Sequence, residues 1–77
     1  MRHRYAVLNG SGHTAIEFAP DIPAEVDQAR REFNEIMRGG QWVIMALGHG
    51  AAGEDVKLTS FDPLARDVVM FQQLVGG

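Results

Sequence analysis

The residues with the clearest chemical potential are the last four of the sequence, Leu74-Val75-Gly76-Gly77. Glycine has no Cβ, so its backbone can enter a narrow slot and approach a nucleotide phosphate more closely than other residues can. A carboxylate on Gly77 could therefore enter the active site of an enzyme and react there with a bound nucleotide. The alternative is an end without function, since two successive glycines arise by chance at one terminus in roughly one chain in 200.

A second glycine pattern, Gly48-His49-Gly50-Ala51-Ala52-Gly53, matches the dinucleotide fingerprint G-x-G-x-x-G and follows an expected strand. Such a site also needs a helix that opens from the loop and binds pyrophosphate at its N-terminus. Residues 54–60 instead alternate like a strand, and the second strand of a βαβ unit is missing. We therefore expect a connecting loop at 48–53 and no nucleotide site.

The remaining side chains do not form a recognisable catalytic or metal-binding set. The histidines, His3, His13 and His49, stand far apart in the sequence, whereas zinc needs three or four convergent ligands. We expect these histidines to be exposed, with no metal site and no cofactor. No base is placed to activate Ser11 or Ser60, so no catalytic residue is predicted and the chain is not expected to be an enzyme.

Composition predicts one small folded domain. The chain has 77 residues, 45% of them hydrophobic, and a formal net charge of −3, which suits a single core. Its seven Lys and Arg residues are dispersed, so nucleic acid is not an expected partner. It contains no cysteine, and no apolar stretch approaches the length of a membrane span or a signal peptide. We therefore expect a cytoplasmic protein without a membrane partner.

The pattern along the chain predicts the order strand, strand, helix, strand, short strand, strand. Strands are expected at 5–8 and 13–18, joined by a turn at Asn9-Gly10-Ser11-Gly12. An apolar stripe at helical spacing predicts a helix from Pro23 to Arg38, with Asp21 as its N-cap. Further strands are expected at 42–47, buried on both faces, at 56–59 and at 67–71.

These elements predict an α+β fold in which one helix packs across a mixed sheet of four or five strands. We expect the first and last strands to be neighbours at the centre of the sheet. The expected core consists of the inward apolar residues of each element: Val7, Ile16, Val26, Phe33, Ile36, Ile44, Val69 and either Leu58 or Phe61.

Two strands, a long helix, a buried strand and a last strand running into Gly-Gly resemble the β-grasp order of ubiquitin and of the sulfur carriers of thiamin and molybdopterin synthesis. The segment 67–77 is similar to the end of those carriers: an acidic turn, an apolar strand, a short linker, a small hydrophobic residue and Gly-Gly. This detailed match covers about eleven residues, and the rest is similar in topology only. The resemblance implies a ubiquitin-like β-grasp domain over residues 1–72 and a flexible tail over 73–77.

By this resemblance the chain is a protein modifier or a sulfur carrier. An activating enzyme, which itself binds ATP, would adenylate the Gly77 carboxylate. The product would pass to a cysteine as a thioester or to sulfide as a thiocarboxylate, and then to an acceptor protein or a sulfur-transfer enzyme. Gly76 and Gly77 would be activated, and Phe71, Leu74 and Val75 would contact the partner. For Phe71, a place in the core and a place in an interface are equally compatible with the sequence.

The chain departs from ubiquitin in its charges. Its single lysine is Lys57 and its tail is uncharged, whereas ubiquitin is rich in lysine and has an arginine in its tail. Self-linkage could therefore use only Lys57 or the amino group of Met1.

The body of the chain also resembles short uncharacterised phage and bacterial proteins that end in Gly-Gly. These carry a Gly-[Asp or His]-Thr turn, here Gly12-His13-Thr14, and a later Phe-Asp-Pro, here Phe61-Asp62-Pro63. The alternative function is therefore that of a small phage or bacterial structural or assembly protein. Such a protein would bind a partner through its sheet edge or its tail.

Overall fold

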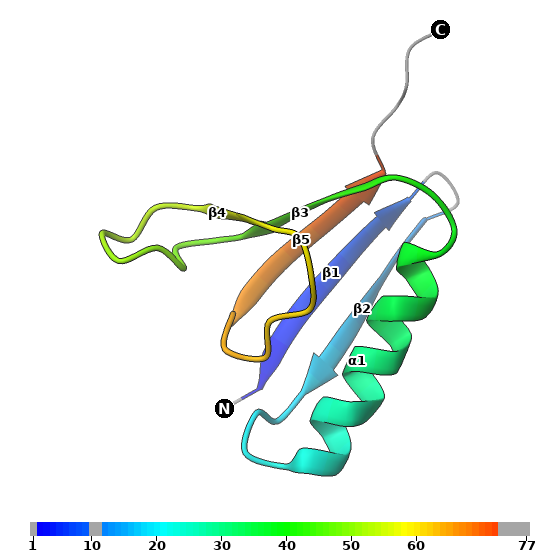
Figure 1. Cartoon of the computed structure of the whole chain (residues 1–77), viewed down its shortest axis with the longest axis horizontal. Helices are drawn as coiled ribbons and strands as arrows, with labels where there is room; N and C mark the ends of the chain where they lie inside the picture. Colours follow the sequence, from blue (N-terminus) through cyan, green and yellow to red (C-terminus); the bar gives the residue numbers. More distant parts are fainter. Residues whose placement is uncertain (1, 10–11, 73–77) are drawn as a thin grey trace, which may run out of the picture.

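The computed structural model describes residues 2–9 and 12–72, with side chains throughout these ranges except at 9, 12 and 13. Five strands form one mixed sheet in the order β2-β1-β5-β3-β4, and one helix packs against it (Figure 1). β1 (His3–Asn9) pairs antiparallel with β2 (Gly12–Phe18) and parallel with β5 (Asp67–Gln72). β3 (Trp42–Ala46) pairs antiparallel with β5 and with β4 (Val56–Leu58), and α1 spans Pro23–Met37. This is a β-grasp-like α+β topology, and the predicted pairing of the first and last strands at the centre is confirmed.

The start of α1 differs from the prediction. Its N-cap is Ile22, not Asp21, and it makes no side-chain cap hydrogen bond. The Glu25 carboxylate in the first turn accepts a hydrogen bond from the Ala19 N–H (2.9 Å) and forms an ion pair with Arg2 (3.2 Å). These contacts fix the helix to the end of β2 without a capping side chain.

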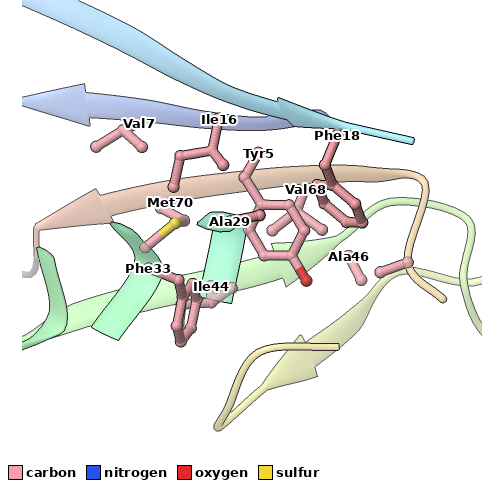
Figure 2. Close-up of a cluster of buried hydrophobic side chains, with 11 residues drawn as sticks. Tyr5, Val7, Ile16, Phe18, Ala29, Phe33, Ile44, Ala46, Val68 and Met70 are labelled. Atoms are coloured by element: carbon pink, nitrogen blue, oxygen red, sulfur yellow. The ribbon is translucent and has the colours of Figure 1, made fainter. Parts of the chain in front are cut away.

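The core lies between the sheet and α1 and draws side chains from four strands and the helix (Figure 2). Its buried members are Tyr5, Val7, Ile16, Phe18, Ala29, Phe33, Ile44, Ala46, Ala65, Val68 and Met70. Most of the predicted core is therefore correct: Val7, Ile16, Phe33 and Ile44 are buried, and Val26, Ile36, Leu58 and Phe61 are partly buried against this cluster.

The predicted inward position on the last strand is wrong. Val68 and Met70 point into the core, while Val69 lies on the opposite face and is half-buried. Successive residues of a strand point to opposite faces, so an unbroken apolar run does not reveal which alternate set faces inward. The same alternation places Phe71 on the face away from α1.

The prediction that β3 is buried on both faces is also wrong. Ile44 and Ala46 are buried beneath the helix side, whereas Val43 and Met45 on the other face are only half-buried. The chain has one helix within the described residues, and it lies on one side of the sheet (Figure 1). Among the described residues no helix covers the other side, and apolar residues lie on it.

Residues 59–66 complete the covered face of the sheet. This segment crosses in front of β1 and β5, beside α1 (Figure 1). Within it, Phe61 stacks on Tyr5 with ring centroids 5.3 Å apart and also lies edge-on to Phe33 at 5.6 Å. A connecting segment, and not a second helix, thus closes this part of the core.

Candidate functional site

Phe71, the predicted partner contact, lies on the open face of the sheet and is 40% exposed. In the strand register it is flanked by Leu8 of β1 and Val43 of β3. Leu8 is 43% exposed and Val43 is half-buried, so these three side chains form a surface. Phe71 is therefore a surface residue and does not belong to the core.

A second apolar row runs beside the first. Ala6, Val69 and Met45 are neighbours in the register of β1, β5 and β3, and all three are half-buried. We call the two rows together the open-face patch: Ala6, Leu8, Val43, Met45, Val69 and Phe71. Contiguous apolar surface of this kind marks a site of contact with another molecule more often than isolated exposed apolar residues do.

Charged residues border this patch. Arg4 lies in register with Glu17 on one side and Asp67 on the other, which forms a charged row beside Ala6. At the outer edge, Lys57 of β4 lies in register with Met45 and is exposed. The single lysine of the chain therefore lies on the same face of the sheet as the patch.

The patch reaches the end of β5. β5 ends at Gln72, directly after Phe71. The other residues predicted to contact or react with a partner, Leu74, Val75, Gly76 and Gly77, lie outside the described residues. Of the predicted site, the structure thus places Phe71 and Lys57 on one face of the sheet.

The G-x-G-x-x-G segment forms turns, so the predicted connecting loop is confirmed. The Gly48 N–H donates a hydrogen bond to Asp55 Oδ1 (2.9 Å), and the Ala52 N–H donates to Glu54 Oε2 (3.0 Å). Both carboxylates occupy donors that a phosphate would need. The loop is followed by β4 and not by a helix, so it also lacks the helix N-terminus of a dinucleotide site.

The segment 61–64 is held by a hydrogen-bond network that no sequence pattern indicates. The Tyr5 hydroxyl donates to the Asp62 carbonyl oxygen (2.6 Å) and accepts from the Asp62 N–H (3.0 Å). The Asp62 carboxylate accepts from the Leu64 N–H (2.9 Å) and lies 3.0 Å from His49 Nε2. Burial is the main reason that the pKa of Tyr5 is raised to about 12. These contacts tie the first strand to both long loops of the domain.

The prediction that the histidines are exposed is wrong for His3. Its side chain is buried, packs edge-on against Phe18 (ring centroids 5.5 Å apart), and places Nδ1 2.9 Å from the Pro63 carbonyl oxygen. His49 is half-buried beside Asp62. Across residues 2–9 and 12–72, no group of three or more His, Cys, Asp or Glu side chains is arranged to hold a metal ion. The side chains of His3 and His49 therefore both contact the segment 62–63 and support the loops of the domain.

A scan against protein-family models, a search of curated proteins and a search of solved structures each found no match. In the part of the chain that the structure describes, no helix is both long and apolar enough to cross a membrane. The candidate functional site is therefore defined by the chain itself: the open-face patch and the end of β5 beside it.

Proposed function

We propose that this chain is a ubiquitin-like protein modifier or sulfur carrier. An oxygen of the Gly77 carboxylate would attack the α-phosphate of ATP held by an activating enzyme, with pyrophosphate as the leaving group. A cysteine thiolate or sulfide would then attack the acyl carbon and release AMP, which yields a thioester or a thiocarboxylate. The domain contributes a recognition surface and the glycines Gly76 and Gly77, which have no side chains to obstruct the active site. The catalytic groups belong to the enzyme.

The observation that carries the proposal is the position of the open-face patch at the end of β5. Phe71 precedes Gln72, the last residue of the strand, and Gly77 follows Phe71 by six positions. Six extended residues span at most about 20 Å. An enzyme that holds the Gly77 carboxylate therefore lies close enough to contact Phe71, Leu8 and Val43 as well.

The place of β5 in the sheet supports the same role. β5 is paired on both sides: Phe71 lies between Leu8 of β1 and Val43 of β3, and the last residue, Gln72, pairs with Trp42 of β3. A fixed departure point limits the positions that the tail can sample, and this lowers the entropy lost when an enzyme binds it. An edge strand would hold the tail less firmly.

Lys57 is the proposed acceptor for self-linkage, together with the amino group of Met1. Its side chain is exposed on β4 and lies in register with Met45 of the open-face patch. A copy attached at Lys57 would therefore cover part of that patch. Linkage at Lys57 would then compete with recognition of the same copy by its enzyme.

The direct test mixes the purified chain with an activating enzyme of the ubiquitin-like or sulfur-carrier type and magnesium-ATP. Pyrophosphate release and intact mass spectrometry report AMP on the C-terminus. We expect adenylation of the native chain and none when one alanine is appended after Gly77 or when Gly76→Leu is introduced. Both variants should keep the native circular dichroism spectrum, because neither change touches the described core.

The contribution of the patch is tested with Phe71→Ser and a matched control, Leu64→Ser. Leu64 is 74% exposed on the segment 59–66, outside the patch. We expect Phe71→Ser to lower the rate of adenylation at least about tenfold, as for an anchor residue in an interface, and Leu64→Ser to leave it unchanged. Equal effects of the two substitutions, or full activity of the tail variants, would overturn the proposal.

Conjugation in cells can be detected by mass spectrometry of tryptic peptides. The last lysine or arginine is Arg66, so trypsin leaves the segment 67–77 attached to any acceptor lysine. We expect tryptic peptides that carry this remnant, or a free end in which sulfur replaces oxygen. The first result indicates a modifier and the second a sulfur carrier.

The second candidate function is that of a small structural or assembly protein that binds a partner through its sheet edge or tail. It is favoured by one observation: no strand in the described ranges pairs with the outer edge of β2. On this alternative, the tail variants that block adenylation would support assembly as well as the native chain does.

A further inference from the structure

The two outer edges of the sheet are protected to different degrees. β4 is only three residues long and carries Lys57, and both short length and lysine are common protections of an exposed edge. β2 is seven residues long, and it contains neither lysine nor proline. Among the described residues, no strand pairs with its outer edge. β2 therefore offers backbone N–H and C=O groups to an added strand. At one end of this edge the exposed Arg2 side chain donates to the Glu17 carbonyl oxygen (3.3 Å), and an added strand would have to displace it there.

An open groove lies along this edge, between β2 and α1. One side of the groove is formed by β2, with Thr14, Ala15 and Ile16. The other side is formed by α1, with Ile36 and two glutamates. Ile16 is buried and Ile36 is half-buried, so the floor of the groove is apolar. The groove therefore has room for an apolar side chain of limited size beside the strand edge.

The helix side of this groove is acidic. Glu32 and Glu35 are lining residues, and both are exposed. Glu35 lies 3.4 Å from Arg38, but the two side chains are 74% and 77% exposed, so this ion pair is weak and is easily exchanged for another. Glu32 forms no ion pair with a side chain in the described part of the chain. The groove thus presents negative charge beside an apolar floor.

We propose that the β2 edge and this groove bind an extended, cationic segment of a partner protein by strand addition. Backbone hydrogen bonds to β2 provide affinity, and side chains on the inner face of the added strand provide specificity. Residues two apart in a strand share a face. The matching pattern is therefore basic-x-apolar-x-basic, with the apolar residue beside Ile16 and Ile36. The basic residues flank it on either side, and their long side chains extend towards Glu32 and Glu35.

A second copy of this chain fits the edge less well. Antiparallel pairing of two β2 strands about a two-fold axis would bring Glu32 and Glu35 of both copies to the same seam. Like charges across a contact oppose association, and each copy also has a net charge of −3. The charge pattern therefore favours a basic partner. The inference does not rest on the chemistry of Gly76 and Gly77.

The test uses two synthetic peptides that differ only in charge, Ser-Lys-Thr-Val-Thr-Lys-Ser and Ser-Glu-Thr-Val-Thr-Glu-Ser, each with blocked ends and a fluorescent label. Anisotropy gives their affinities, and amide chemical shifts of the labelled protein locate the bound peptide. We expect the lysine peptide to bind more tightly, with shifts at residues 14–18 and 32–36. Shifts centred on the open-face patch, equal binding of both peptides, or no binding of either would overturn the proposal.

Substitutions in the protein test the same charge pairing from the other side. Glu32→Lys should weaken binding of the lysine peptide about three- to tenfold and strengthen binding of the glutamate peptide, because it reverses one exposed charge pair. Asp21→Lys makes the same charge change before α1, outside the groove, and should change either affinity less than about twofold. Equal effects of the two substitutions would show that net charge alone attracts the peptide, which also overturns the site.

Two further measurements separate this inference from the others. The variant with one residue appended after Gly77 should bind the lysine peptide as the native chain does, even though it cannot be adenylated. Sedimentation should show a monomer. A β2-mediated dimer in solution would mean that the edge is occupied by a second copy, which contradicts the proposed basic partner.

Discussion

Replacing Tyr5 with phenylalanine is expected to release the segment 61–64 while it leaves the aromatic packing in place. The Tyr5 hydroxyl makes two hydrogen bonds to the backbone of Asp62, one as donor (2.6 Å) and one as acceptor (3.0 Å). The ring itself stacks on Phe61, and this contact needs no hydroxyl. Tyr5→Phe therefore removes the two hydrogen bonds and little else.

The cost follows from the two backbone groups that lose their partner. A buried donor or acceptor left without a hydrogen bond costs about 1–3 kcal/mol. Asp62 is half-buried, so water can reach it in part, and we expect a total of about 2 kcal/mol. For a domain of this size, this corresponds to a fall in Tm of roughly 8–16 °C. The loss is a large share of the roughly 4–12 kcal/mol that a chain of this length has in total.

The burial of Tyr5, and not its hydrogen bond to Asp62, predicts how stability depends on pH. Burial raises the pKa of Tyr5 from 10.0 to about 12, so the folded state holds this proton more tightly than the unfolded state does. The contribution is fully present below pH 10 and is lost as the pH rises through about 12. At 1.36 kcal/mol per pH unit, the loss is at most about 2.7 kcal/mol, and less where solvent reaches the hydroxyl.

Tyr5 is the only tyrosine, so the absorbance of tyrosinate titrates this residue alone. We expect a midpoint near 12 in the folded protein, and urea unfolding curves that lose stability above about pH 10 in the native chain but not in Tyr5→Phe. Asp62→Ala is the control, because it removes the carboxylate and keeps both backbone hydrogen bonds. A folded-state midpoint near 10 would contradict the burial of the hydroxyl, and a Tyr5→Phe protein as stable as the native one would refute the role assigned to the two hydrogen bonds.

Three further predictions concern packing and charge. Phe33→Ala should cost about 3–5 kcal/mol in urea unfolding, since the ring is buried and packs edge-on against Tyr5 and Phe61; an unchanged unfolding curve contradicts the packing. Val68→Ala should cost about 2 kcal/mol and Val69→Ala less than about 1 kcal/mol by the same measurement, because only Val68 faces the core; equal costs would place the register of β5 in error. A double-mutant cycle of His49→Ala and Asp62→Ala should give a coupling energy below about 1 kcal/mol, since both side chains are near 30% exposed, and a larger value would indicate a role beyond loop support.

Local patterns were sufficient to predict the helix and the first hairpin. The predicted helix, Pro23–Arg38, differs from α1 by one residue because its apolar stripe repeats at 3.6 residues without interruption. Local patterns do not predict contacts between residues that are far apart in the sequence. Tyr5 and Asp62 are 57 positions apart, and no property of either residue indicates the other. His3 is mispredicted for the same reason, because its partner Pro63 lies 60 positions away.

The candidate site was predictable only in part. Phe71 is identified by its place before the tail, but its exposure depends on which face of the sheet the helix covers. The run Val68-Val69-Met70-Phe71 has no polar residue to mark the outward side, so the register of β5 cannot be read from it. The open-face patch combines strands that are not consecutive in the sequence, and only the sheet order brings them together.

The central position of β5 also determines when the domain can assemble. Without residues 67–72, the chain reduces to two hairpins, β1–β2 and β3–β4, that have no strand in common. Pairing of Tyr5 with Val68 closes a loop of most of the chain, which is a slow step compared with hairpin formation. A nascent chain on the ribosome would therefore stay open until its last strand emerges. A fragment covering residues 1–66 should remain unfolded alone and should fold when it binds a synthetic β5 peptide. The domain is therefore a candidate for split-protein complementation.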